Sequence, residues 1–103
     1  MSQTTLCEAI TSKHVVQFYY DSKKSPGIRV VEPHMVAYNQ KNNLILSGWF
    51  LGGETGSAEG PGWREYLLDK ISSLSVLQET FSPPRPGYVR DGGKMFHNVQ
   101  CAV

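Results

Sequence analysis

Most of the chain consists of short stretches in which β-branched and aromatic residues are dense or alternate with polar ones. This pattern is typical of β-strands packed on a small core. The stretches are separated by polar, glycine-containing or proline-containing segments. The third stretch is almost wholly apolar, which indicates a central strand. The predicted strands cover residues 15–20, 28–38, 44–51, 63–68 and 71–77.

A helical pattern precedes the first predicted strand. Leu6, Ala9 and Ile10 form a short apolar stripe at helical spacing. Thr5 and Glu8 have the spacing of a capping box, with Thr5 as the N-cap. We therefore expect a short helix over residues 5–12 that lies across one end of the sheet.

The segments between the predicted strands contain turn residues. Residues 21–27 form a polar turn that ends in Pro-Gly, and residues 39–43 form a second turn. Pro33 interrupts the second strand, so that position is an edge, a bulge or a bend. Residues 52–62 are rich in glycine and predict a mobile, protease-sensitive loop. Asp69 and Lys70 predict a tight corner before the fifth strand.

One short helix followed by five antiparallel strands is the pattern of a small closed or nearly closed β-barrel. The length of 103 residues suits one domain. We assign residues 1–81 to the barrel and residues 82–103 to an extension, in which a Pro/Gly-rich linker is followed by a last strand over residues 94–103.

The C-terminal strand is too apolar to remain unpaired in water. The linker can bring it to its own barrel or to that of a neighbouring chain. Exchange of such an element between identical chains is a low-cost route to a dimer. We therefore expect a homo-oligomer, with residues 82–103 contributing to the interface.

The charge balance limits the possible functions. The net charge is +1 and 18% of the residues are charged, whereas non-specific nucleic-acid binders carry a large basic excess. Any anion-binding site must therefore be local. The chain has neither a signal-peptide pattern nor an apolar run near the roughly 18 residues that cross a bilayer. We expect a soluble, cytoplasmic protein with no membrane partner.

Cys7 and Cys101 lie near opposite ends of the chain. They can form a disulfide, or they can be two buried thiols. We favour two thiols, because disulfides are rare in a reducing cytoplasm.

The sequence shows no pattern of a catalytic centre. His14, His34 and His97 lack metal-ligand spacing, so we expect no metal and no cofactor. The serines near residue 73 lack a nucleophile elbow, and the glycine-rich loop lacks the Lys-Ser ending of a P-loop. We expect a protein that is not an enzyme.

Two arginines on predicted strands are the main candidates for a binding site. Arg29 and Arg64 lie among aromatic and aliphatic residues, a mixture that suits an anionic, ring-bearing ligand such as a nucleotide or single-stranded nucleic acid. The alternative is that each pairs with a carboxylate, Glu32 or Glu65. Because side chains alternate between the faces of a strand, parity decides the face that each arginine occupies.

Other residues have two interpretations. Tyr20, Trp49 and Tyr66 can stack on a base, although aromatic residues in strands more often belong to the core. His34 can donate a hydrogen bond to a phosphate or lie at the edge of the core. Lys70 can contribute to a basic rim or cap a turn.

The order of these segments resembles the WYL domain family. The most specific part is Arg64-Glu65-Tyr66-Leu67-Leu68-Asp69-Lys70-Ile71, and the second is Arg29 followed by Pro33. The resemblance covers residues 6–81. It implies an Sm-like small barrel that acts as a ligand-sensing module in bacterial transcription regulation.

The chain departs from the family pattern at several positions. Residues 44–46 are Leu-Ile-Leu where the family has Trp-Tyr-Leu, and Leu67 stands where a second arginine is usual. Lys70 replaces an arginine and lacks its bidentate geometry. Family members commonly carry a winged helix-turn-helix ahead of this domain. Too few residues precede the first strand for one here, so we expect a sensing module that acts with a separate DNA-binding or effector protein.

Two classes of function remain. The first is a regulatory module that binds a nucleotide or a short nucleic-acid segment. The second is a structural or protein-interaction barrel with a degenerate pocket, acting through oligomerisation. If Arg29 and Arg64 line one open groove, the first class is favoured. If both form ion pairs with carboxylates, the second is favoured. An Sm-like RNA-binding ring is disfavoured by the low net charge.

Overall fold

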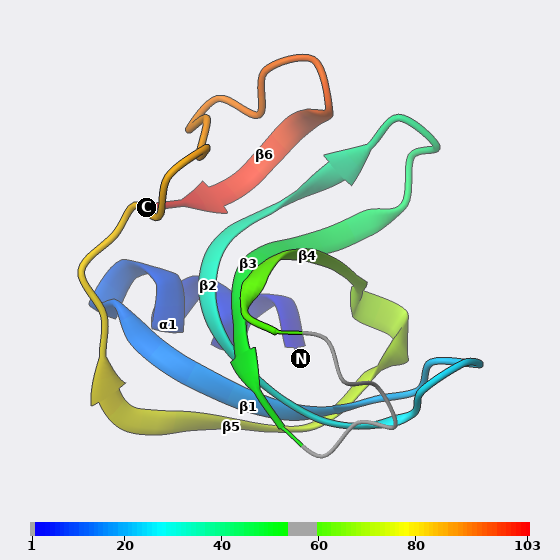
Figure 1. Ribbon diagram of the computed structural model, residues 1–103. Coiled ribbons are helices and arrows are strands. Elements are labelled where there is room, and N and C mark those ends of the chain that lie inside the picture. Colours follow the sequence, from blue (N-terminus) through cyan, green and yellow to red (C-terminus); the bar gives the residue numbers. More distant parts are fainter. Residues whose placement is uncertain (1, 54–59) are drawn as a thin grey trace.

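The computed structural model describes residues 2–53 and 60–103 (Figure 1). These residues form one α-helix, six β-strands and one short 3-10 helix, which confirms a mainly β fold. In chain order the elements are α1 (Ser2–Ser12), β1 (His14–Tyr20), β2 (Gly27–Asn39), β3 (Leu44–Gly52), β4 (Gly62–Leu67), η1 (Leu68–Lys70), β5 (Ile71–Thr80) and β6 (Phe96–Ala102).

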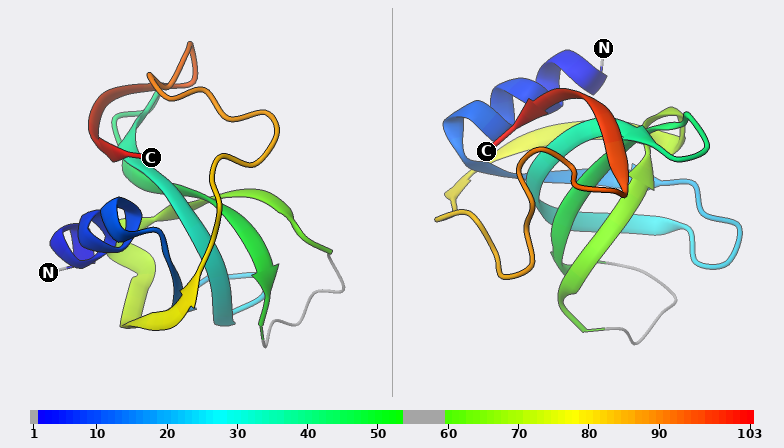
Figure 2. Two further views of the ribbon diagram at one scale, coloured as in Figure 1. Left: turned by 90° about the vertical axis from the view of Figure 1, so that its left-hand side faces the viewer. Right: turned by 90° about the horizontal axis from the view of Figure 1, so that it is seen from above.

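All six strands belong to one antiparallel sheet. The strand order is β4-β3-β2-β1-β5, and β6 pairs with β2 off this path. The sheet curls around the core, and α1 lies across one end of it (Figures 1 and 2). Within the described ranges no ladder joins β4 to β5, because the chain turns between them through η1. The expected closed or nearly closed five-stranded barrel is therefore not confirmed, because the described residues form a curved sheet of six strands that does not close.

Strand β2 changes partner at Pro33. Before the proline it pairs with β1, from Gly27 to Val31, and after it with β6, from Met35 to Asn39. Both partners lie along the same edge of β2, while β3 runs along the other. Proline has no N–H to donate, so it falls at the gap between two ladders. The expected irregularity is confirmed by a register shift between Pro33 and Met35.

Gly48 on β3 lies opposite Pro33. A Cβ atom at this position would lie 2.5 Å from Val31 Cγ1 and 2.9 Å from the carbonyl oxygen of Glu32. The two strands approach each other too closely here for any side chain. Glycine is therefore required where β2 bends over β3.

Helix α1 begins at Ser2, not at the predicted N-cap Thr5. Threonine inside a helix costs well under about 1 kcal/mol, which an extra hydrogen-bonded turn offsets. The predicted stripe of Leu6, Ala9 and Ile10 is confirmed, since all three are at most 1% exposed. They close the core against the apolar face of the sheet. Core partners from the strands include Val16, Phe18, Val31, Val36, Leu46, Phe50 and Tyr66.

The predicted turn over residues 39–43 is confirmed. The side-chain oxygen of Asn39 accepts hydrogen bonds from the backbone N–H groups of Lys41 and Asn43, each at 3.0 Å. Asn42 has a positive φ of 61°, which asparagine tolerates. The predicted mobile loop over residues 52–62 falls mainly on residues 54–59, which lie outside the described residues.

The C-terminal strand pairs with β2 of its own chain, and a disulfide joins it to α1. The bond links Cys7 to Cys101 across 94 residues of sequence, with their Cα atoms 5.7 Å apart. The expectation of two free thiols is therefore wrong, because the fold brings the two ends of the chain together. No helix among the described residues is long and apolar enough to cross a membrane.

We predict that Cys101→Ser lowers the free energy of unfolding by about 2–5 kcal/mol, because a cross-link that closes so long a loop restricts the unfolded chain. Urea unfolding at pH 7.5 measures the change. Cys7→Ser and the double variant should show the same decrease in unfolding free energy as Cys101→Ser, since each of the three variants lacks the same disulfide. Two free thiols in a thiol assay of the unfolded, unreduced protein would contradict the disulfide.

Candidate functional site

Arg29 and Arg64 lie on the same, core-facing side of the sheet. Directly paired residues of antiparallel strands point to one face, and Arg29 pairs with the fully buried Phe18. Arg64 is two residues from Tyr66, so the two share a face. The ring centroids of Tyr66 and Phe18 are 5.1 Å apart. The register therefore places both arginines on the concave face.

Arg29 is 7% exposed. Its guanidinium donates to the carbonyl oxygen of Gly27 at 3.1 Å and to that of Ser25, and it lies 5.7 Å from the ring centroid of Tyr20. A cation over an aromatic face is a stabilising arrangement. Among the described residues Arg29 forms no ion pair, so the predicted alternative pairing with Glu32 is wrong.

Arg64 has a similar environment. Its guanidinium donates to the carbonyl oxygens of Trp63 at 2.8 Å and Gly60 at 3.0 Å. It lies 5.6 Å from the ring centroid of Phe50. Its neighbour Glu65 is exposed, and alternation directs it to the opposite face. Each arginine is thus held over an aromatic ring by backbone carbonyl groups.

The two arginines lie at different levels of the concave face. Val30, next to Arg29, pairs with Gly52 of β3, whereas Arg64 pairs with Gly48. Four residue positions along a strand correspond to roughly 13 Å. This separation is that of the backbone positions, and the Arg64 side chain extends from its own toward Gly60 and Phe50, nearer the level of Arg29.

Tyr20 and Tyr66 form the aromatic floor between the arginines. Their rings meet edge to face with centroids 5.0 Å apart. The Tyr20 hydroxyl accepts a hydrogen bond from the backbone N–H of Leu67 at 3.0 Å, which fixes its ring. Tyr66 is 4% exposed and belongs to the core. Tyr20 is the more accessible of the two, and its ring already lies under Arg29.

Trp49 lies away from this face, and Lys70 lies beyond the end of β4. Lys70 is the last residue of η1, and its carbonyl oxygen accepts a hydrogen bond from Asp21 N–H at 3.0 Å. Trp49 pairs with Trp63 and precedes the core residue Phe50, so both tryptophans point to the convex face. The structure therefore separates Trp49 from the arginines.

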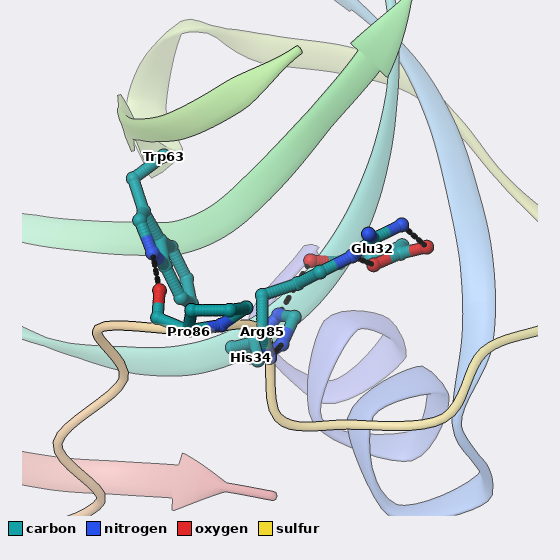
Figure 3. Close-up of polar contacts among 5 residues, drawn as sticks. All are labelled: Glu32, His34, Trp63, Arg85 and Pro86. Atoms are coloured by element: carbon teal, nitrogen blue, oxygen red, sulfur yellow. Dashed lines mark hydrogen bonds and ion pairs between the residues drawn. The ribbon is translucent and has the colours of Figure 1, made fainter.

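An ion pair not anticipated from the sequence fixes residues 82–103, here called the C-terminal segment, to the convex face (Figure 3). Arg85 Nε donates to Glu32 Oε1 at 2.7 Å, and its NH2 group donates to Oε2 at 2.9 Å. This bidentate geometry is the strong form of a carboxylate contact. The same guanidinium lies 5.0 Å from the ring centroid of Trp49. Glu32 is only 6% exposed.

His34 lies beneath this ion pair and is fully buried. Its Nδ1 is 2.9 Å from the carbonyl oxygen of Glu32, and its Nε2 is 3.2 Å from the backbone nitrogen of Arg85. Because a carbonyl only accepts and a backbone N–H only donates, Nδ1 carries the proton and Nε2 is the acceptor. Both ring nitrogens are therefore occupied, and neither can donate to a phosphate. The structure supports the alternative interpretation of His34 as a residue at the edge of the core.

Aromatic contacts continue this attachment along the C-terminal segment. Trp63 Nε1 donates to the carbonyl oxygen of Pro86 at 2.6 Å (Figure 3). Tyr88 stacks on Trp63 with centroids 6.0 Å apart. The Tyr88 hydroxyl lies 3.2 Å from the carbonyl oxygen of His34 and 3.3 Å from that of Val103. Burial raises the pKa of Tyr88, so it keeps its proton as a donor.

The sequence contained one signal for this attachment. A carboxylate between apolar neighbours needs a cationic partner when it is buried, and Glu32, between Val31 and Pro33, is such a residue. Its partner, Arg85, lies 53 positions away between prolines. Several cations were equally eligible, so sequence alone did not select Arg85.

Comparisons with known proteins agree with this fold. The family model of the WYL domain matches residues 3–76, and the chain therefore belongs to the WYL domain family. The resemblance noted in the sequence is confirmed. No curated protein matches the chain at a significant level.

Among solved structures, proteasome accessory factor B/C (PafBC) of Arthrobacter aurescens is similar to this chain. The sequence identity is 22% and the TM-score 0.66. The match covers 82% of this chain and 13% of that protein, so the chain corresponds to a small part of it. At this identity the likeness concerns the fold.

We predict that His34 makes stability depend on pH. Burial lowers its pKa from the usual 6.5, so the unfolded state binds a proton more readily than the folded state. Stability is then complete above pH 6.5 and falls as the pH drops below it. His34→Gln keeps a donor and an acceptor but does not titrate. Urea unfolding between pH 7.5 and 5.5 should show a smaller loss for this variant than for the wild type.

His97→Gln is the matched control, because His97 is an exposed histidine on β6. Its loss between the same pH values should equal that of the wild type. If His34→Gln loses as much unfolding free energy as the wild type, or if His97→Gln loses less, the pH dependence does not come from His34.

Proposed function

We propose that this chain is a non-enzymatic, ligand-sensing regulatory module. Its ligand is an anionic, ring-bearing molecule, a nucleotide or a short single-stranded segment, held on the concave face by Arg29 and Arg64. One observation supports this above all. Two guanidinium groups, each over an aromatic ring, occupy the same face of one small sheet.

The donors of Arg29 suit a phosphate. A guanidinium has five N–H groups in a planar fork that matches phosphate oxygens. Arg29 makes three hydrogen bonds, to Gly27 and Ser25, which leaves two N–H groups for a ligand. A base of the same ligand would lie beside Tyr20, whose ring lies under Arg29. Lys70, at the end of η1, would add charge at the rim.

The family supports a sensing role. A sensing module of this kind transmits ligand binding to another domain or chain, so a separate DNA-binding or effector protein is the proposed partner. PafBC is described as a proteasome accessory factor, and its likeness to this chain is one of fold.

The alternative function is protein interaction through sheet edges. Strands β4 and β5 are each paired on one side only in the described residues, and unpaired edges can bind another chain. Val76 on β5 is 44% exposed. A homo-oligomer therefore stays a prediction, to be checked by light scattering of the intact chain. Deleting residues 82–103 is an unsuitable test, because it removes β6 and the disulfide partner of Cys7.

We predict that Arg29→Ala and Arg64→Ala each weaken binding of AMP or a short fluorescent oligothymidine by about 1.5–3 kcal/mol, the range for a charge-assisted hydrogen bond. Fluorescence anisotropy and calorimetry at low salt measure the change. Arg64→Lys should fall between the wild type and Arg64→Ala, because it keeps the charge and loses the fork.

Lys41→Ala is the matched control, since it removes one exposed cation from the β2–β3 turn. It should change affinity only slightly, and that change should vanish at high salt. Equal losses in Lys41→Ala and Arg29→Ala would show bulk attraction instead of a site. Absence of binding to every probe, together with a dimer mass, would favour the interaction module.

A further inference from the structure

A cavity of about 490 Å³ lies on the convex side of the sheet, and Arg64 of the candidate site is one of its lining residues. One wall belongs to the sheet and the other to the C-terminal segment. The volume is within the range of small-molecule sites, roughly 300–1,000 Å³. Its main side chains are Met35, Ser47 and Trp63 on the sheet side and Tyr88, Val89 and Met95 on the other.

The wall formed by the C-terminal segment is fixed before any ligand arrives. Arg85 and Pro86 attach its start to Glu32 and Trp63 (Figure 3). Its far end is held by Gln40, whose Nε2 donates to the carbonyl oxygen of Lys94 at 2.9 Å. A pocket whose walls are already ordered binds with a smaller entropy cost than one that must form on binding.

The lining is mainly apolar. Val89 and Met95 are 54% and 58% exposed, and both line this cavity. Such side chains at the mouth of a cavity gain stability when an apolar group covers them. The planes of Trp63 and Tyr88 are only 15° apart, so the aromatic part of the lining suits a flat molecule.

The polar groups define the rest of the ligand. Ser47 is 9% exposed, and its hydroxyl has no hydrogen-bond partner in the part of the chain that the structure describes. It can bind one polar group of a ligand. Glu65 and Lys94 also line the cavity and have opposite charges. Arg64 lines the cavity as well, although its guanidinium lies over the ring of Phe50.

We infer that this cavity is a second ligand site, for a small, uncharged, planar molecule with an apolar ring and one hydrogen-bonding group. It differs from the proposed nucleotide site in most of its lining, which belongs to the convex face of the sheet and to the C-terminal segment, although Arg64 takes part in both. The C-terminal segment then has a function of its own, since it supplies the outer wall.

The neutral fluorescent probe N-phenyl-1-naphthylamine tests this inference. The wild-type protein should enhance its fluorescence in a saturable manner. Met95→Lys and Val89→Lys should each raise the apparent Kd for the probe about tenfold, because binding would desolvate the new charge. Val76→Lys makes the same kind of change at an exposed position on β5 outside the cavity, and it should leave the Kd unchanged. Circular dichroism melts confirm that all variants fold.

Three outcomes would overturn the inference. The first is no saturable fluorescence enhancement with the wild type, and the second is a loss of probe affinity in Val76→Lys equal to that in Met95→Lys. The third is a dimer mass by light scattering that Met95→Lys converts to a monomer, because a second copy of the chain would then cover the cavity. Arg29 separates the two sites, because it does not line the cavity. Arg29→Ala should therefore leave probe binding intact, and a loss equal to that of Met95→Lys would also overturn the inference. Failure of AMP to bind at all would affect only the proposed function.

Discussion

The bend of β2 at Pro33 is the constraint on which the rest of this structure depends. A proline without an N–H ends the ladder with β1 and allows β6 to occupy the same edge two residues later. The close approach at Gly48 lets the sheet fold over itself. Without this change of partner, β6 would have no place in the sheet, and Cys101 would not reach Cys7.

The curved sheet gives one short strand two different tasks. Consecutive residues of a strand point to opposite faces, so Arg64 contributes to the concave face and Trp63 to the convex face. The same alternation on β2 directs Arg29 inward and Glu32 toward Arg85. The buried carboxylate is stable because a bidentate partner covers it. The C-terminal segment is therefore packed against the sheet as part of the domain.

Much of this arrangement follows from local pattern. Alternation located every strand to within a few residues, and Pro33 marked the bulge, because these signals act between near neighbours. Thr5 was misread as a cap, since threonine is nearly as stable inside a helix. The disulfide of Cys7 and Cys101, the burial of His34 and the role of Arg85 depend on contacts across 50 or more residues. No local spacing encodes such contacts. Likewise, the face that each arginine occupies could be assigned only once the pairing of the strands was known.

The proposed function depends on binding of an anionic, ring-bearing ligand at the concave face. Backbone NMR of the isotopically labelled protein during a titration with AMP tests it most directly. Saturable shifts are expected at the amides of Gly27, Arg29 and Arg64, with little change at Lys41 or in residues 94–96. Shifts confined to exposed cations such as Lys41, or the absence of any saturable shift, would contradict it.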